Sequence, residues 1–270
     1  MNRRIGLIKY TFLKRRLGGS MKAWLLNCLG PTCSVLSKRL IEEIDNVDDY
    51  IKIKIRNREG FLFYHKSLPL HSLYQTLAEQ LYEWHWHYYQ IPQTKVAHDD
   101  IILDCGCAEG IFSFLNNKEA KHIYAFEPLP EYLEGLRKTF KNITNVTIIN
   151  SALGDKHGTV YLKKAGIASS ITLEKTETEV NIDTIDHFCS THNIKVSYIK
   201  ADLEGYEMNL LQGASEIIKE YKPKIAITTY HKECHACEIM EYLKSNVPSY
   251  NIIVKGIETV KGAPAMLHAW

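Results

Sequence analysis

Two acids and two glycines at the ends of two short apolar runs have the types and spacing that predict chemistry. The first apolar run ends in Asp104, and Gly106 and Gly110 stand two and six positions after that acid. The next apolar run ends in Glu127. Acids that close neighbouring strands, with glycines between them, indicate a cleft for a nucleoside-like cofactor. Glycine lets the backbone approach such a cofactor without a Cβ in the way.

The charges of these residues favour S-adenosylmethionine over a dinucleotide. A dinucleotide brings a pyrophosphate and is typically bound by G-x-G-x-x-G at a helix N-terminus. Here three residues separate Gly106 from Gly110, and an acid precedes both. S-adenosylmethionine has no phosphate and carries an ammonium, a sulfonium and a ribose diol. We expect Asp104 to meet its cationic end, directly or through water, and Glu127 to bind both ribose hydroxyls.

Further polar or small residues follow the later apolar runs. Ser151 and Ala152 come after the third run and suit the face and edge of an adenine ring. Asp202 follows the fourth run and is expected near the transferring methyl group. The complete set predicted to bind the cofactor is Asp104, Gly106, Cys107, Gly110, Glu127, Pro128, Ser151, Ala152 and Asp202.

Catalytic groups are expected at the fourth and fifth strand ends. Lys200, Asp202 and Glu204 alternate, so they can face one way as the strand ends. His231 follows the fifth run, and a neutral imidazole near pH 7 can take a proton from a hydroxyl. The predicted catalytic residues are therefore His231, Asp202 and Lys200. No metal site is predicted outright, but Asp202 and Glu204 offer oxygen ligands if Mg²⁺ is used.

An alternation of strands and helices from residue 100 onward must position these groups. This pattern is typical of an α/β fold with a parallel sheet. An additional strand over 159–162 is expected to pair with 180–182. The predicted strands are 101–105, 122–126, 146–150, 196–201, 224–230, 250–255 and 264–269, and the predicted helices lie near 110–117, 130–141, 206–212 and 233–245.

The chain before this domain is expected to form a cap. A short helix over 35–45, a hairpin over 50–64 and a long helix from Pro69 to Tyr88 fit the spacing of apolar residues. Trp86 and His87 are candidates for a wall of the acceptor pocket. We therefore predict three segments, namely a basic, flexible arm over 1–34, an α+β cap over 35–96 and an S-adenosylmethionine-binding domain over 97–270.

Composition limits the partners and the compartment. Nine Lys or Arg and no acid precede Glu42, so the arm could make weak contact with an anionic membrane surface. A small-molecule or glycan acceptor is expected, and nucleic acid is not. Seven cysteines in a chain of 270 residues fit a reducing compartment, and no apolar run is long enough to span a bilayer, so a cytoplasmic location is expected.

Over roughly residues 97–245 the chain resembles the FkbM family of S-adenosylmethionine-dependent methyltransferases. The resemblance rests on five strings, which are Leu103–Gly106 with Gly110, Ala125–Pro128, Asn150–Asp155, Ile199–Gly205 with Glu207, and Pro223–Ala226 leading to Tyr230–Lys232. It implies a class I methyltransferase fold, Rossmann-like, with a seven-stranded sheet that is mostly parallel and has an antiparallel last strand.

The resemblance also implies an O-methyltransferase acting on a hydroxyl of a sugar, sugar nucleotide, glycan or natural product, as in polysaccharide biosynthesis. Two rival functions remain open from the residues. One is a nicotinamide-dependent oxidoreductase on a similar sheet, against which the missing G-x-G-x-x-G counts. The other is a non-catalytic protein with a degenerate cofactor site. Fold alone does not decide among these functions.

Overall fold

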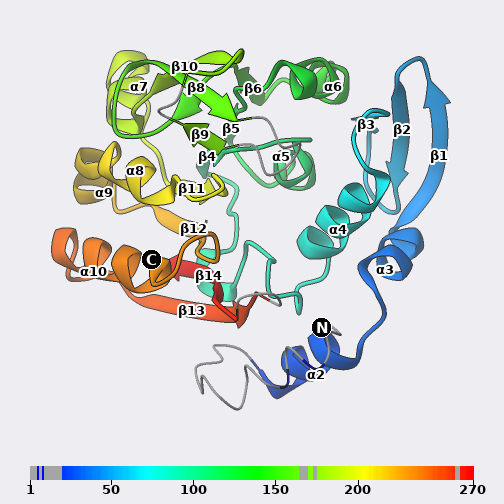
Figure 1. Cartoon of the computed structure of the whole chain (residues 1–270), viewed down its shortest axis with the longest axis horizontal. Coiled ribbons are helices and arrows are strands. Elements are labelled where there is room, and N and C mark those ends of the chain that lie inside the picture. The colour runs from blue at the N-terminus through cyan, green and yellow to red at the C-terminus, as the bar shows by residue number, and fades with distance from the viewer. Residues whose placement is uncertain (1–4, 6–7, 9–19, 164–169, 173–174, 259–261) are drawn as a thin grey trace.

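The protein is described here from a computed structural model that covers Ile5, Ile8 and residues 20–163, 170–172, 175–258 and 262–270 (Figure 1). Half of the basic arm predicted over 1–34 falls outside these ranges, so the flexibility of that half and the arm's contact with an anionic membrane surface stay predictions. Within the described part of the chain, no helix is both long and apolar enough to cross a membrane.

A seven-stranded sheet positions the site. Its order is β13-β14-β12-β11-β4-β5-β6. β14 runs antiparallel to both of its neighbours, and the other pairs are parallel. The predicted class I sheet, with its last strand antiparallel, is confirmed. The strands are β4 (Ile101–Cys105), β5 (His122–Phe126), β6 (Val146–Ile149), β11 (Tyr198–Ala201), β12 (Lys224–Thr228), β13 (Ile252–Ile257) and β14 (Pro264–Ala269).

Side chains alternate between the two faces of this sheet, as the strand period of two requires. On one face Leu103 and Ile199 pack with Phe188, Ile218 and Leu243, which come from α7, α9 and α10. The predicted helices after β4, β5, β11 and β12 are present. The helices of this domain are α5 (Ile111–Asn116), α6 (Pro130–Phe140), α7 (Ile185–His192), α8 (Glu207–Gln212), α9 (Ser215–Tyr221) and α10 (His235–Asn246).

A second sheet lies between β6 and α7 in the sequence. Its order is β7-β10-β8-β9. Val160 of β8 pairs with Val180 of β10 in antiparallel register, which confirms the predicted partnership of these segments. The strands are β7 (Ala152–Leu153), β8 (Gly158–Lys163), β9 (Ser170–Thr172) and β10 (Glu179–Asp183).

The segment before the main sheet forms a cap of helices and a three-stranded sheet (Figure 1). The predicted hairpin is confirmed as β2 and β3, but β1 pairs with β2 where a helix was expected to continue to residue 45. Its elements are α2 (Met21–Leu29), α3 (Cys33–Leu40), β1 (Ile41–Val47), β2 (Tyr50–Ile55), β3 (Leu62–His65), α4 (Leu70–Leu81) and the 3₁₀ turn η1 (Pro92–Thr94).

Two other expectations for the chain before the main sheet are wrong, one within the predicted arm and one within the predicted cap. Residues 21–29 form α2, with the Ser20 side chain accepting a hydrogen bond from the Ala23 amide, where irregular chain was expected. The helix from Pro69 ends at Leu81 and does not reach Tyr88, because the chain turns extended at its C-cap. The aromatic residues beyond it therefore occupy a connection between α4 and η1, and not a helical stripe.

Candidate active site

A cleft lies at the carboxyl ends of the central strands, where β4 is flanked by β5 on one side and β11 on the other. Connections leave neighbouring strands in opposite directions at this point, which is where ligands bind in open α/β sheets. The cleft has a cavity volume of about 80 Å³ and is open to solvent. It is lined by Gly106, Ala108, Phe126, Glu127, Pro128, Leu129, Tyr132, Ser151, Ala152, Leu153, Leu162, Ile171, Asp202, Leu203 and Glu204.

The turn after β4 needs glycine at two positions because it packs closely. Gly106 has φ +70°, and a Cβ there would collide with the Asp202 carbonyl oxygen. Gly110 has φ +73°, and a Cβ there would lie 2.5 Å from Leu136 Cδ2 of α6. Gly106 lines the cleft, whereas Gly110 caps α5 against α6 and is not part of the lining. Their predicted contacts with the cofactor stay predictions.

Asp104 and Lys200 form a buried ion pair beneath this turn. They stand opposite each other in the register of β4 and β11, with Lys200 Nζ 2.9 Å from Asp104 Oδ1. Ser113 Oγ donates to Asp104 at 2.7 Å, and Lys200 Nζ donates to the Gly106 carbonyl at 2.8 Å. Burial alone would lower the pKa of Lys200, but the Asp104 and Asp202 carboxylates outweigh it and raise that pKa.

This pairing changes how both residues can act. Neither Asp104 nor Lys200 is among the residues that line the cleft. The pair holds the Gly106 carbonyl in place, so it supports the turn that lines the cleft. The predicted catalytic role of Lys200, and the predicted contact of Asp104 with the cofactor, are not tested by this geometry and stay predictions. Cys107 is likewise buried in the apolar core and absent from the lining.

Glu127 brings a buried carboxylate to the cleft wall. Its Oε2 accepts from the Ala108 amide at 2.9 Å, and its Oε1 accepts from the Leu129 amide at 2.9 Å. Burial raises its pKa to about 7, and the nearby Glu109 carboxylate adds to that shift. Burial also raises the pKa of Glu109 to about 7.

The surroundings of these two acids fit the predicted cofactor. Among the described residues, Glu109 Oε1 and the Tyr132 hydroxyl are buried without a hydrogen-bond partner. A ligand with hydroxyl groups would give the Tyr132 hydroxyl, which lines the cleft, a hydrogen-bond partner, because an unpaired buried polar group is costly. Ser151 and Ala152 lie across the cleft beside apolar side chains, which offers a slot for a planar base. The residues present therefore fit S-adenosylmethionine.

A cluster of three acids surrounds His231 at the cleft rim. His231 Nδ1 lies 2.7 Å from Glu207 Oε1, and its Nε2 lies 3.6 Å from Asp202 Oδ1 and 3.4 Å from Glu204 Oε2. Burial lowers the pKa of His231, but its ion pair with Glu204, its hydrogen bond with Glu207 and the charge of Asp202 raise it to about 10. The ring is therefore cationic at neutral pH, and not neutral as expected from the sequence.

The same cluster argues against the Mg²⁺ ion that Asp202 and Glu204 were expected to bind if a metal is used. The imidazolium of His231 already supplies positive charge between these two carboxylates. A metal there would have to displace a hydrogen-bonded cation. Magnesium therefore gains no support from the arrangement.

Tyr89 is a site residue that the sequence reasoning missed. Its hydroxyl donates to Asp202 Oδ2 at 2.6 Å, and Thr228 Oγ1 donates to Asp202 Oδ1 at 3.0 Å. In the sequence, the only feature that could have pointed to Tyr89 is that it belongs to the run of aromatic residues before the main sheet. Trp86, proposed for the acceptor wall, is buried in an apolar cluster. His87 contacts the ring of Tyr230, with centroids 5.1 Å apart.

Comparisons with known proteins agree with this fold. A family model described as the methyltransferase FkbM domain matches residues 104–247. A solved structure titled methyltransferase FkbM, from Methylobacillus flagellatus KT, superposes with a TM-score of 0.53 at 20% identity and covers 76% of this chain and 56% of that one. That likeness shows the fold alone.

A curated relative, hexuronic acid methyltransferase AglP of Haloferax volcanii, is 25% identical over 130 residues, which are 46% of this chain and 54% of that protein. The match thus spans about half the length of this relative. The family model, by contrast, covers more than half of the present chain and includes Asp104 and Cys105 at the end of β4, Glu127 and the cluster around His231. We conclude that this chain belongs to the FkbM methyltransferase family.

Proposed function

We propose that this protein is an S-adenosylmethionine-dependent O-methyltransferase that acts on a hydroxyl of a sugar, sugar nucleotide or glycan. One observation carries the proposal. A single cleft is lined both by Glu127, at the end of β5, and by Asp202, at the end of β11. We assign the first to the ribose of the cofactor and the second to the acceptor hydroxyl.

Glu127 is the residue we assign to the ribose of the cofactor. Its carboxylate is buried and held by two backbone amides, so its oxygens are fixed before any ligand arrives. A fixed acceptor loses little entropy on binding, which favours affinity. Apolar side chains such as Phe126 and Leu153 flank the same cleft and offer surface for adenine.

Asp202 is the residue we assign to the proton of the acceptor. When bound, S-adenosylmethionine supplies a methyl group on a sulfonium leaving group. Asp202 would take the proton that the acceptor hydroxyl loses as its oxygen accepts the methyl group in place of the sulfur. His231 is already protonated, so it serves to hold Asp202 and Glu204 in position. Most of the rate enhancement then comes from alignment of the reacting groups.

An acidic sugar is the acceptor class that we favour. The Haloferax relative is named a hexuronic acid methyltransferase, and its match to this chain supports a related acceptor. A hexuronic acid offers both hydroxyls and a carboxylate. Methylation of a hydroxyl forms an ether that resists mild base, whereas methylation of the carboxylate forms an ester that mild base cleaves.

The first test is cofactor binding by calorimetry. The purified chain should bind S-adenosylhomocysteine and show no heat of binding with NAD. Binding of NAD without S-adenosylhomocysteine would favour the oxidoreductase alternative and overturn the proposal.

The second test is a mass-spectrometric screen of uronic acids, sugar nucleotides and oligosaccharides for a methyl gain that survives mild base. Asp202→Asn should remove this gain, and Asp99→Asn, an exposed matched control, should keep it. Cofactor binding with no methyl gain on any acceptor would favour the non-catalytic alternative. Gains that mild base removes would contradict transfer to a hydroxyl.

A further inference from the structure

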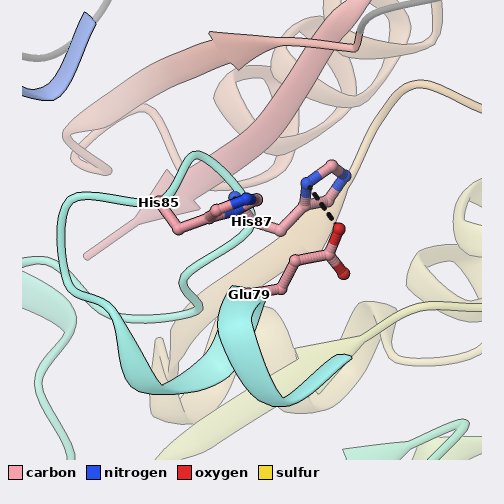
Figure 2. Close-up of side chains that lie close together, drawn as sticks. All are labelled: Glu79, His85 and His87. Carbon is pink, nitrogen blue, oxygen red and sulfur yellow. Dashed lines mark hydrogen bonds and ion pairs between the residues drawn. The ribbon is translucent and has the colours of Figure 1, made fainter. Parts of the chain in front are cut away.

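Glu79, His85 and His87 gather outside the cleft, at the point where α4 ends (Figure 2). Glu79 belongs to the last turns of α4, and the two histidines belong to the connection that follows the helix. One potential ligand atom from each of the three residues lies within 4.8 Å of the other two. Imidazole and carboxylate are donors that zinc and similar divalent transition metals accept together.

The spacing of these donors fits a shared metal better than a direct hydrogen bond. Glu79 Oε1 and His87 Nδ1 lie 3.5 Å apart. Two ligands that are each about 2.0–2.1 Å from a tetrahedral zinc ion lie about 3.4 Å from each other. His87 Nδ1 is also buried, and it makes no hydrogen bond to any residue that the structure describes.

The surroundings of the three residues orient their side chains and still leave them accessible to an ion from solvent. The Gln75 amide donates to Glu79 Oε1 at 2.9 Å and so orients the carboxylate. The side chains of Glu79 and His87 are 16% and 17% exposed, and His85 is buried. Partial burial lowers competition from water, while the remaining exposure leaves a route for an ion.

We propose that Glu79, His85 and His87 bind a divalent transition-metal ion of the zinc class. The ion would tie the connection after α4 to the end of that helix. The same connection carries Tyr89, whose hydroxyl donates to Asp202. His87 also contacts the ring of Tyr230, which in turn lies 4.1 Å from the ring of His231 between centroids. Tyr89 and Tyr230 thus lie between the metal site and the candidate active site. The role of the metal is to position these two side chains.

A second cluster in the chain offers a matched control. His157, Asp183 and His187 also bring three potential ligand atoms within 4.8 Å of one another. Here, however, Asp183 Oδ1 is already within hydrogen-bond distance of His157 Nδ1 at 3.1 Å and His187 Nδ1 at 2.8 Å. Both histidines are exposed. Satisfied, solvated groups of this kind gain little from a metal.

The test measures Zn²⁺ binding to the full chain after removal of metals with a chelator. Calorimetry should show one tight site, and Co²⁺ in its place should give the intense visible absorption of a tetrahedral complex. His87→Ala and Glu79→Gln should each weaken Zn²⁺ binding by at least about 100-fold, because loss of a ligand costs no less than the roughly 10–100-fold seen when a residue that only orients a ligand is lost. His187→Ala should leave the affinity unchanged.

A stability measurement separates loss of a ligand from loss of the fold. Saturating Zn²⁺ should raise the midpoint of thermal unfolding of the wild-type chain and of His187→Ala, because ligand binds the folded state. The same Zn²⁺ concentration should raise that of Glu79→Gln, which preserves side-chain shape, by much less. Absence of tight Zn²⁺ binding to the full chain, or equal loss in His187→Ala, would overturn the proposal. Binding of S-adenosylhomocysteine to the same samples reports separately on the proposed function.

Discussion

The burial of Glu109 predicts how the free energy of unfolding depends on pH, and the structure gives the size of the effect. Burial raises the pKa of its carboxyl from 4.5 to about 7. The folded protein therefore holds a proton that the unfolded chain has lost between these two values, so the free energy of unfolding falls as pH rises through this window. The gap of about 2.5 pH units, at about 1.36 kcal/mol each, corresponds to about 3 kcal/mol.

Glu109→Gln should remove this pH-dependent loss while it preserves the shape of the protonated side chain. Relative to the wild type, the variant should gain about 3 kcal/mol of unfolding free energy at pH 8 and less than about 1 kcal/mol at pH 5. Urea unfolding across this range measures the difference. Glu241→Gln, at an exposed position, is the matched control and should differ little at either pH. A Glu109→Gln difference that stays constant from pH 5 to pH 8 would refute the assigned burial penalty.

Three further predictions concern the cleft. Glu127→Ala should weaken S-adenosylhomocysteine binding by about 1–3 kcal/mol in calorimetry, the usual cost of losing a charged hydrogen bond, and an unchanged affinity would exclude the ribose role. Tyr89→Phe removes the hydroxyl that donates to Asp202, so kcat should fall about tenfold or more while cofactor affinity is kept; equal kcat would show that the bond has no part in catalysis. Gly106→Ala should lower the free energy of unfolding by more than about 2 kcal/mol in urea, because the new Cβ would meet backbone at a left-handed φ, and an unchanged urea midpoint would contradict that packing.

The sequence predicted the sheet well where strands are buried on both faces. β4, β5 and β14 have the predicted bounds, since their apolar runs end sharply at polar or small residues. The two helices α7 and α9 were missed because each spans only two turns and shows a short apolar stripe. A cue for α7 was present, since Thr184 Oγ1 accepts a hydrogen bond from the His187 amide as an N-cap.

The cap was predicted less well because local patterns there compete with tertiary pairing. Residues 41–47 carry spacing that suits a helix, but β2 offers a free edge to which their backbone pairs. The aromatic residues after Leu81 match a helical spacing over a short window. The position of each is set instead by its own tertiary contact. Tyr89 donates a hydrogen bond to Asp202, and His87 contacts the ring of Tyr230.

The predicted site residues came from strand ends, which a single sequence can locate. Their partners could not be found in that way. Lys200 meets Asp104 only because β11 lies beside β4, a neighbour relation that depends on the strand order of the whole sheet. The charge state of His231 likewise depends on three acids that converge in space, so its raised pKa was beyond the reach of residue spacing.

The hydrogen bond from Tyr89 to Asp202 joins the segment that matches the family model to a part of the chain outside that match. Asp202 lies within the segment 104–247 that matches the family model, and Tyr89 lies before it. Two proteins could therefore agree at every position of that segment and still present Asp202 to an acceptor with a different proton donor beside it. A chimera that exchanges only the connection after α4 would alter the reactivity of this carboxylate while every family motif stayed intact. Motif identity alone is thus an incomplete guide to which acceptors such a chain can methylate.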